Sequence, residues 1–192
     1  EQLRSQGLDW NPPTLQSASE PRCIIDGQEM VMLSANNYLN LATHPKVVEA
    51  SIEATRKYGA GSGSVRAIAG TLDLHLEAER VCAQFKQVEA VLIYSSGYTA
   101  NVGLIPTLVR GSEDIIISDE LNHGSIIDGV RLTRASRAVY QHNDMSALEQ
   151  VLKEHSGSGR KLIITDGVFS MDGDVAVLDE STELADDHDA MV

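Results

Sequence analysis

The sequence predicts an α/β fold in which a mostly parallel β-sheet is flanked by helices. Short, unbroken apolar segments recur through the second half of the chain, and segments with helical apolar spacing separate them. Strands of a parallel sheet are covered on both faces, so they are continuous apolar runs, and their crossovers are helices. The 192 residues are 42% hydrophobic and 22% charged, which is typical of a globular protein.

Residues 1–44 are predicted to form an N-terminal arm and a β-hairpin. The apolar runs 23–25 and 30–33 flank Asp26-Gly27. Asp-Gly between two such runs is typical of a tight hairpin turn, because Gly tolerates positive φ. Residues 45–192 are predicted to form a second domain.

Two helices are expected before the sheet. Pro45 suits the first helical position and Gly59 a helix end, so the first helix is predicted over 45–58. Thr71 is the expected N-cap of the second, over about 71–86. The loop between them is rich in glycine.

Strands and helices alternate from residue 91 onward. The expected strands are 91–94, 115–117, 138–140 and 162–165, and the expected helices are 98–109, 123–133, 145–155 and 178–188. Asp144 is the expected N-cap of the third of these helices. The last residues, Ala190-Met191-Val192, resemble the start of a buried strand. A strand cut there would leave unpaired backbone groups, so we expect the protein to continue beyond Val192.

The net charge and the cysteine content make several classes of protein less consistent with the sequence. There are 15 Lys+Arg against 28 Asp+Glu, a net charge of -13, so no cationic surplus exists for binding a nucleic-acid backbone. Cys23 and Cys82 are too few for a disulfide framework and lack zinc spacing, which favours reduced thiols in a cytoplasmic protein. No apolar run approaches the ~20 residues of a membrane span, and no signal-peptide pattern is present.

Ligands of open α/β sheets bind beyond the carboxyl ends of the strands, so the residues after each strand are the candidates. Gly97 and Tyr98 open a helix after strand 91–94. A helix start offers free N–H groups to an anion, and Gly permits close approach of the backbone. The alternative is an ordinary capped turn with Ser96 as the N-cap.

Two further strand ends carry candidates. His123 follows strand 115–117 and could stack on a flat ligand or titrate near neutral pH, or it could simply cap the next helix. The loop after 162–165 is polar and includes Ser170. Its acidic residues lack the remaining ligands of a calcium loop, which disfavours a metal site. P-loop, dinucleotide-binding and nucleophile-elbow patterns are not found.

Five motifs combine into a more specific pattern. They are Ala35–Leu39, Gly59–Arg66 with Gly70-Thr71, Tyr94–Tyr98, Asp119–Gly129 and Thr165–Asp174. Together they resemble the α-oxoamine synthase family of pyridoxal 5'-phosphate (PLP) enzymes, from about residue 20 to 192. The resemblance implies the type I fold of PLP-dependent transferases (aspartate aminotransferase-like). Residues 45–192 would then be an incomplete PLP-binding large domain, without its C-terminal part and the small domain.

The resemblance also implies roles for individual residues. Gly97 and Tyr98 match the backbone cradle for the cofactor phosphate. His123 matches the residue that stacks on the cofactor ring and faces the substrate. Ser170 matches a hydroxyl that contacts the cofactor, and Asn36 matches a residue that holds the amino-acid carboxylate.

The sequence also departs from the family pattern. Asn40 stands where the family usually has Gly, which affects the backbone of that loop. None of the five lysines, Lys46, Lys57, Lys86, Lys153 and Lys161, matches the Schiff-base lysine of the family. That lysine and the Asp that holds the pyridine nitrogen are expected beyond Val192, so the fragment is expected to be inactive alone.

Within the family the motifs are most similar to glycine C-acetyltransferases, which condense glycine with acetyl-CoA to a 2-amino-3-oxo acid. The alternative is an 8-amino-7-oxononanoate synthase, which uses alanine and a pimeloyl thioester. The partners implied are an amino acid, an acyl-CoA and a second copy of the chain, with neither nucleic acid nor membrane. Two other interpretations remain open: an ordinary aminotransferase or lyase of this fold, and a truncated copy without activity.

Overall fold

A computed structural model describes residues 2–192. The chain divides into two compact units, Glu1–Ala78 and Glu79–Val192, and each is described by itself.

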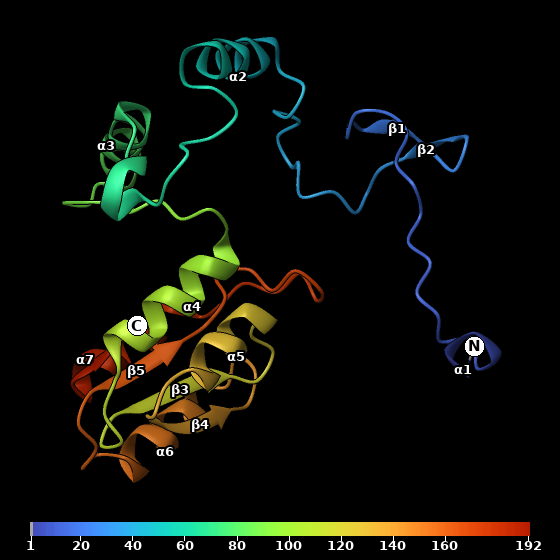
Figure 1. The fold of residues 1–192 in the computed structure, drawn as a ribbon. Helices are drawn as coiled ribbons and strands as arrows, with labels where there is room; N and C mark the ends of the chain where they lie inside the picture. Colours follow the sequence, from blue (N-terminus) through green and yellow to red (C-terminus); the bar gives the residue numbers. More distant parts are fainter. Residues whose placement is uncertain (1) are drawn as a thin grey trace. The chain divides into compact units, whose positions relative to one another are not determined.

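The first unit begins with the predicted arm and hairpin (Figure 1). A short helix α1 (Gln2–Ser5) precedes strands β1 (Arg22–Ile25) and β2 (Gln28–Val31). The two strands pair antiparallel, with Ile25 opposite Gln28. Asp26 and Gly27 both have positive φ, 48° and 79°, which a two-residue hairpin turn of this kind requires. The predicted hairpin is confirmed.

Helix α2 (Pro45–Tyr58) has the predicted bounds. Its N-cap is His44, whose Nδ1 accepts the Lys46 N–H at 3.2 Å, and it ends where Gly59 turns to a φ of 82°. A one-turn π-helix η1 (Arg66–Gly70) follows the glycine-rich loop.

Helix α3 (Asp73–Lys86) begins two residues later than predicted. The expected cap is wrong because the Thr71 hydroxyl donates to the Arg66 carbonyl at 2.7 Å instead of accepting from the helix. The division between the two units falls within this helix.

The second unit is the predicted parallel sheet with flanking helices. Its elements are α4 (Gly97–Leu108), β3 (Ile115–Asp119), α5 (Gly124–Arg131), β4 (Ser136–Tyr140), α6 (Met145–Glu154), β5 (Lys161–Ile164), α7 (Leu178–Asp187) and β6 (Ala190–Met191). The strand order is β4-β3-β5-β6, and every pairing is parallel. Asp144 caps α6 as expected, accepting the Ala147 N–H at 2.9 Å.

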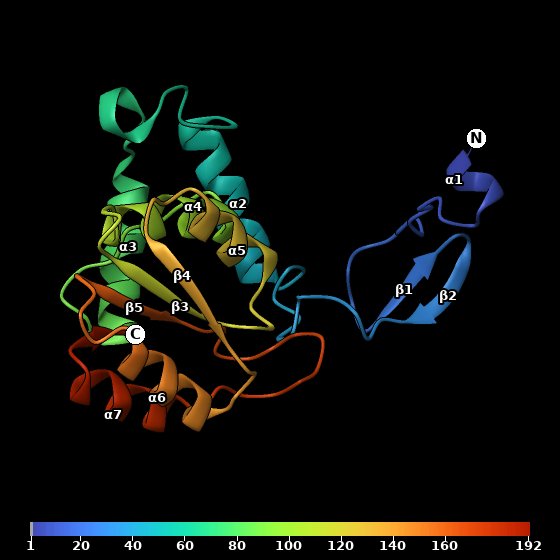
Figure 2. The same ribbon diagram turned by 90° about the horizontal axis from the view of Figure 1, so that it is seen from below.

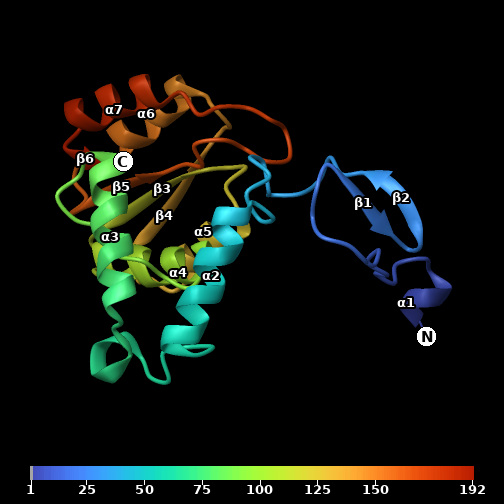
Figure 3. The same ribbon diagram turned by 90° about the horizontal axis from the view of Figure 1, so that it is seen from above.

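The two faces of the sheet bury separate cores. Helices α4 and α5 cover one face, and α6 and α7 cover the other (Figures 2 and 3). Side chains alternate along each strand: Ile116 and Leu162 point to the first face, and Ile115 and Ile163 point to the second. This double coverage is why the strands are unbroken apolar runs.

One predicted strand is missing. Residues 91–94 are extended but form no ladder, and Leu92 and Tyr94 are exposed. A β-strand needs a neighbour to satisfy its backbone groups. No strand within residues 2–192 pairs with this segment, and the Ile93 N–H donates instead to the Glu79 carboxylate at 3.0 Å.

Cys23 is buried, Cys82 is exposed, and both are free thiols. Among residues 2–192, no helix combines the length and the apolar character that crossing a bilayer requires.

The buried core predicts that substituting two different leucines will change the free energy of unfolding by different amounts. Leu148 of α6 is fully buried against Ile115 and Ile117, whereas Leu132 is 64% exposed. Leu148→Ala should lower the free energy of unfolding by about 2–5 kcal/mol, because it leaves a cavity. Leu132→Ala should change it by no more than about 0.5 kcal/mol. Urea titration followed by circular dichroism measures both, and equal effects would contradict the assigned core.

Candidate functional site

The order of the strands indicates where a ligand is expected at the carboxyl edge of the sheet. From β3 the chain crosses to β4 on one side, and it later returns to place β5 on the other side of β3. The crossover helices α5 and α6 lie on opposite faces (Figure 2). The carboxyl ends of β3 and β5 therefore form a topological switch point, where ligands of such sheets bind.

A buried asparagine joins the two strands at this point. The Asn122 amide nitrogen donates to the Ile164 carbonyl at 2.7 Å and to the Ser118 hydroxyl at 2.9 Å. Its amide oxygen accepts the Asp166 N–H at 2.8 Å. Asn122 is only 5% exposed, so these bonds form away from water and hold the turn after β3 against the turn after β5.

His123 is held in place through its backbone and one ring nitrogen. Its N–H donates to the Asp166 carboxylate at 2.7 Å. Its Nδ1 accepts the Ser125 N–H at 3.1 Å, so His123 is the N-cap of α5, as one of the two interpretations expected. The imidazole is nevertheless exposed, so capping leaves it accessible to a ligand.

A second bond to Nδ1 favours one tautomer of His123. The Ser125 hydroxyl lies 2.7 Å from Nδ1, and the Asn101 amide nitrogen donates to that hydroxyl at 2.9 Å. Because Asn101 donates to the hydroxyl oxygen and the Ser125 N–H already points at Nδ1, the hydroxyl proton is directed at Nδ1 as well. Nδ1 is then an acceptor, and the neutral ring carries its proton on Nε2.

The start of α4 is built to leave backbone donors open. Ser96 and Thr99 form a capping box, with the Ser96 hydroxyl accepting the Thr99 N–H at 3.1 Å. The N–H groups of Gly97 and Tyr98 have no intrahelical acceptor, because they belong to the first turn. A Cβ built on Gly97 meets no atom within 4 Å. The first turn therefore has room for an anion against the backbone, which fits a phosphate group.

The start of α4 is tied to α5. The Tyr98 hydroxyl donates to the Asp128 carboxylate at 3.1 Å, and Asp128 pairs with Arg131 at 3.1 Å. The hydrogen bond to Asp128 raises the pKa of Tyr98 above its usual value. Together with the bond between Asn101 and Ser125, this contact places Gly97, Tyr98 and His123 on two adjoining helix starts.

Ser170 lies on a loop that has its own internal order. The loop after β5 closes through a bridge between Val168 and Val175, and the Phe169 N–H donates to the Asp174 carbonyl at 2.8 Å. Gly173 takes a φ of 82°, which permits the tight return. Ser170 is exposed at the tip of this loop.

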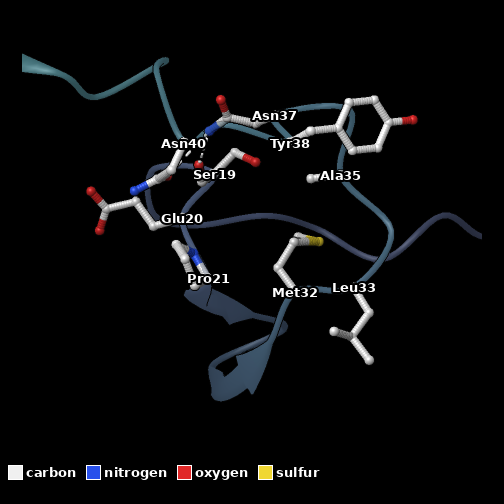
Figure 4. A pocket seen from close by; sticks show the side chains of 9 residues that line it. All are labelled: Ser19, Glu20, Pro21, Met32, Leu33, Ala35, Asn37, Tyr38 and Asn40. Atoms are coloured by element: carbon white, nitrogen blue, oxygen red, sulfur yellow. Dashed lines mark hydrogen bonds between the residues drawn. The ribbon is translucent and has the colours of Figure 1, made fainter.

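The remaining candidate, Asn36, belongs to the first unit. Its side chain is exposed and lies 3.5 Å from the Tyr38 hydroxyl. The neighbouring Asn37 holds the loop together, since its amide nitrogen donates to the Ser19 carbonyl at 2.8 Å (Figure 4). Asn40 has a φ of 50°, so a left-handed residue is required where the family usually has Gly, and Asn is one of the residues that tolerate it.

This loop borders a cavity of about 270 Å³ in the first unit (Figure 4). Its lining residues are Ser19, Glu20, Pro21, Met32, Leu33, Ala35, Asn37, Tyr38 and Asn40. Asn36 is not among them.

The groups that hold the site together are not apparent from the sequence. Asn122 and Asp166 were part of recognised motifs, but nothing in the sequence showed that they bond to each other. His142 follows β4 and contacts the loop of Ser170 through Phe169 and Asp174. The rule applied to the other strand ends, extended to the residues after Tyr140, would have found it.

Comparison with known proteins gives the family. A family model described as aminotransferase class I and II matches residues 28–192. The 8-amino-7-oxononanoate synthase of Thermoanaerobacter pseudethanolicus is 53% identical over 192 residues, which is 100% of this chain and 48% of the relative. The 8-amino-7-oxononanoate synthase 1 of Bacillus subtilis is 50% identical over 178 residues, covering 93% of this chain and 45% of the relative. This chain thus spans about half the length of these curated relatives.

Solved structures also match this chain. Serine palmitoyltransferase from S. paucimobilis, with a bound PLP–myriocin compound, matches with a TM-score of 0.92 and 31% identity over 100% of this chain and 50% of that chain. The 8-amino-7-oxononanoate synthase of Francisella tularensis matches with a TM-score of 0.65 and 30% identity over 79% and 41%. The predicted α/β fold of PLP-dependent transferases is confirmed. The relatives favour 8-amino-7-oxononanoate synthase, the alternative, over the predicted glycine C-acetyltransferase.

The role of Asn122 can be tested directly. Asn122→Ala should lower the free energy of unfolding by about 2–4 kcal/mol, because it leaves the Ile164 carbonyl and the Asp166 N–H buried without this partner. The Asp166 amide should also exchange with solvent faster. Denaturant titration and hydrogen exchange measure the two effects. Asn11→Ala, at an exposed position, is the control, and unchanged exchange at Asp166 would contradict the bridge.

Proposed function

Because the chain belongs to the aminotransferase class I and II family, whose members similar to it are PLP-dependent α-oxoamine synthases, we propose that it forms part of an enzyme of this type. The proposed reaction joins L-alanine to a pimeloyl thioester. The α-carbon of alanine bonds to the thioester carbonyl carbon, the alanine carboxylate leaves as CO2, and the thiol of CoA is released. The product is 8-amino-7-oxononanoate.

The observation that carries this proposal is the identity to 8-amino-7-oxononanoate synthases across the chain. It reaches 53% over all 192 residues and 54% over 190 residues for the synthase of Symbiobacterium thermophilum. The matched stretch includes every motif on which the α-oxoamine synthase resemblance rests. Three of the motifs, Tyr94–Tyr98, Asp119–Gly129 and Thr165–Asp174, lie where the cofactor is expected. The cofactor is common to both reactions, so these motifs do not separate the two acyl preferences.

The described residues fit the phosphate and the ring of PLP. When bound, PLP supplies a ring that stabilises negative charge at the α-carbon of the amino acid. The open N–H groups of Gly97 and Tyr98 would hold the phosphate at the start of α4. The exposed face of His123 would cover the ring, and its Nε2–H would point away from the helix that it caps.

The other two candidates complete the proposed roles. The Ser170 hydroxyl, exposed on the loop after β5, would contact the cofactor. Asn36, whose side chain is exposed, would hold the carboxylate of the amino acid. We further propose that the enzyme acts as a homodimer in the cytoplasm, a compartment in which the free thiols Cys23 and Cys82 would stay reduced.

Substrate preference tests the reaction. The natural gene product, supplied with PLP, should release free thiol from pimeloyl-CoA with L-alanine, and kcat/KM should exceed that for acetyl-CoA with glycine on the order of 100-fold. Thiol release followed with a chromogenic disulfide measures both. The reverse preference would restore the glycine C-acetyltransferase interpretation, and transamination without a thioester would indicate an ordinary aminotransferase.

Gly97→Ala tests the proposed phosphate site. The added methyl meets no protein atom, and Ala favours a helix by up to about 1 kcal/mol over Gly, so the free energy of unfolding should be unchanged or slightly higher. PLP affinity should fall about tenfold, because the methyl occupies the space of the phosphate. Fluorescence titration with PLP, with and without competing inorganic phosphate, measures the affinity.

Gly157→Ala is the matched control, since a Cβ at that loop position also meets nothing within 4 Å. Equal PLP affinity in the two variants would place the phosphate elsewhere.

A further inference from the structure

His142 lies between two carboxylates that come from different segments of the second unit. Its Nδ1 is 3.0 and 3.2 Å from the two oxygens of Asp119, at the end of β3, and its Nε2 is 3.3 Å from Oδ2 of Asp174, on the loop after β5. The imidazole is only 15% exposed. One side chain thus connects the rigid edge of the sheet to the loop that carries Ser170.

The Asp119 end of this connection is fixed. The Asp119 carboxylate is fully buried and accepts two backbone N–H groups, from Leu121 at 2.9 Å and from Asn143 at 3.1 Å. These two hydrogen bonds fix the position of the carboxylate, so its oxygens stay beside Nδ1.

The loop end is held by several contacts. The buried ring of Phe169 packs edge-on against His142, with ring centroids 4.4 Å apart. The Asn143 amide donates to the Val175 carbonyl at 3.3 Å. Asp174, by contrast, is 54% exposed, so its bond to Nε2 is the contact most easily released.

The two nitrogens of His142 need protons in order to hold both carboxylates. Only the imidazolium donates from both nitrogens, whereas the neutral ring keeps one donor. Nδ1 faces the buried charge of Asp119, so the remaining proton stays there. Nε2 then becomes an acceptor, and the Asn143 amide nitrogen, 3.3 Å away, is its alternative partner. When His142 loses a proton, the hydrogen-bond partner of Nε2 therefore changes from Asp174 to Asn143.

The other titratable groups near the His142 ring do not replace Asp174 as the partner of Nε2. The Glu120 carboxylate accepts the backbone N–H of His142 at 3.0 Å, which does not involve the ring. Burial and the charge of Asp119 raise the pKa of Tyr140 to about 12, so its phenol stays neutral. Asp144 and Glu180 line the neighbouring cavity and add negative charge near the imidazolium.

We propose that His142 is a positioning residue for the loop of Ser170, which it ties to the sheet edge through Asp119 and Asp174 when protonated and releases on the Asp174 side when neutral. The role in cofactor binding rests on the proposed function, in which Ser170 contacts PLP. The tie itself rests only on the geometry.

The direction of the pH dependence follows from the pKa. Hydrogen bonding to Asp119 raises the pKa of His142 above its usual 6.5, and Asp174 raises it further. A group whose pKa is raised on folding contributes its full stability below the unfolded value and loses it as the pH rises through the folded value. The loop is therefore held near pH 6 and released at alkaline pH.

Asp174→Ala tests the tie without threatening the fold, because it removes the acceptor for Nε2 and the carboxylate is exposed. In the natural gene product, the Phe169 and Gly173 amides should exchange with solvent about tenfold faster than in the wild type at pH 6 and equally at pH 9, after correction for intrinsic rates. Asp172→Ala, which removes an exposed carboxylate from the same loop, should match the wild type at both pH values. His142→Asn keeps a donor toward Asp119 but none toward Asp174, so it should behave like Asp174→Ala.

PLP affinity gives the second readout. In the wild type it should weaken between pH 6 and pH 9 by severalfold more than in Asp174→Ala. Wild-type exchange that is independent of pH and equal to that of Asp174→Ala would overturn the tie. Faster exchange with an unchanged PLP profile would overturn the positioning role. Failure of the wild type to bind PLP at any pH would count against the proposed function, and the exchange data would still decide the tie.

Discussion

The architecture of the candidate site depends on the buried amide of Asn122. Its donors and its acceptor connect the ends of β3 and β5, which are the two strands on either side of the switch point. Asp166, placed by this amide, then accepts the N–H of His123. A sheet edge would otherwise end in two independent turns. The amide converts them into one rigid surface, on which the start of α5 has a defined position.

Around this bridge, the buried side chains hold the site residues in position. The exposed groups are available to a ligand. Ser125 and Asn101 orient the His123 ring from within α5 and α4, and the Ser96–Thr99 capping box fixes the first turn of α4. Gly97, His123 and Ser170 are all exposed. This division suits a cofactor site, because a bound group needs several fixed contacts that cost no rearrangement on binding.

Predictions from the sequence succeeded where structure is local. The hairpin at Asp26-Gly27 and the caps Ser96 and Asp144 depend on residues within a few positions of one another, and all three are confirmed. The strand at 91–94 was wrong because a strand needs a partner that its own residues do not reveal. The Thr71 cap was wrong because the hydroxyl found a different acceptor nearby, the Arg66 carbonyl.

The fold class, the family resemblance and the candidate side chains could all be predicted from the sequence, because apolar periodicity and short motifs are local patterns along the chain. How those candidates are held depends on tertiary contacts. The contacts of Asn122 with Ile164 and of His142 with Asp174 join residues 42 and 32 positions apart. The strand order that brings such residues together is set by packing on both faces of the sheet, and no local pattern specifies it.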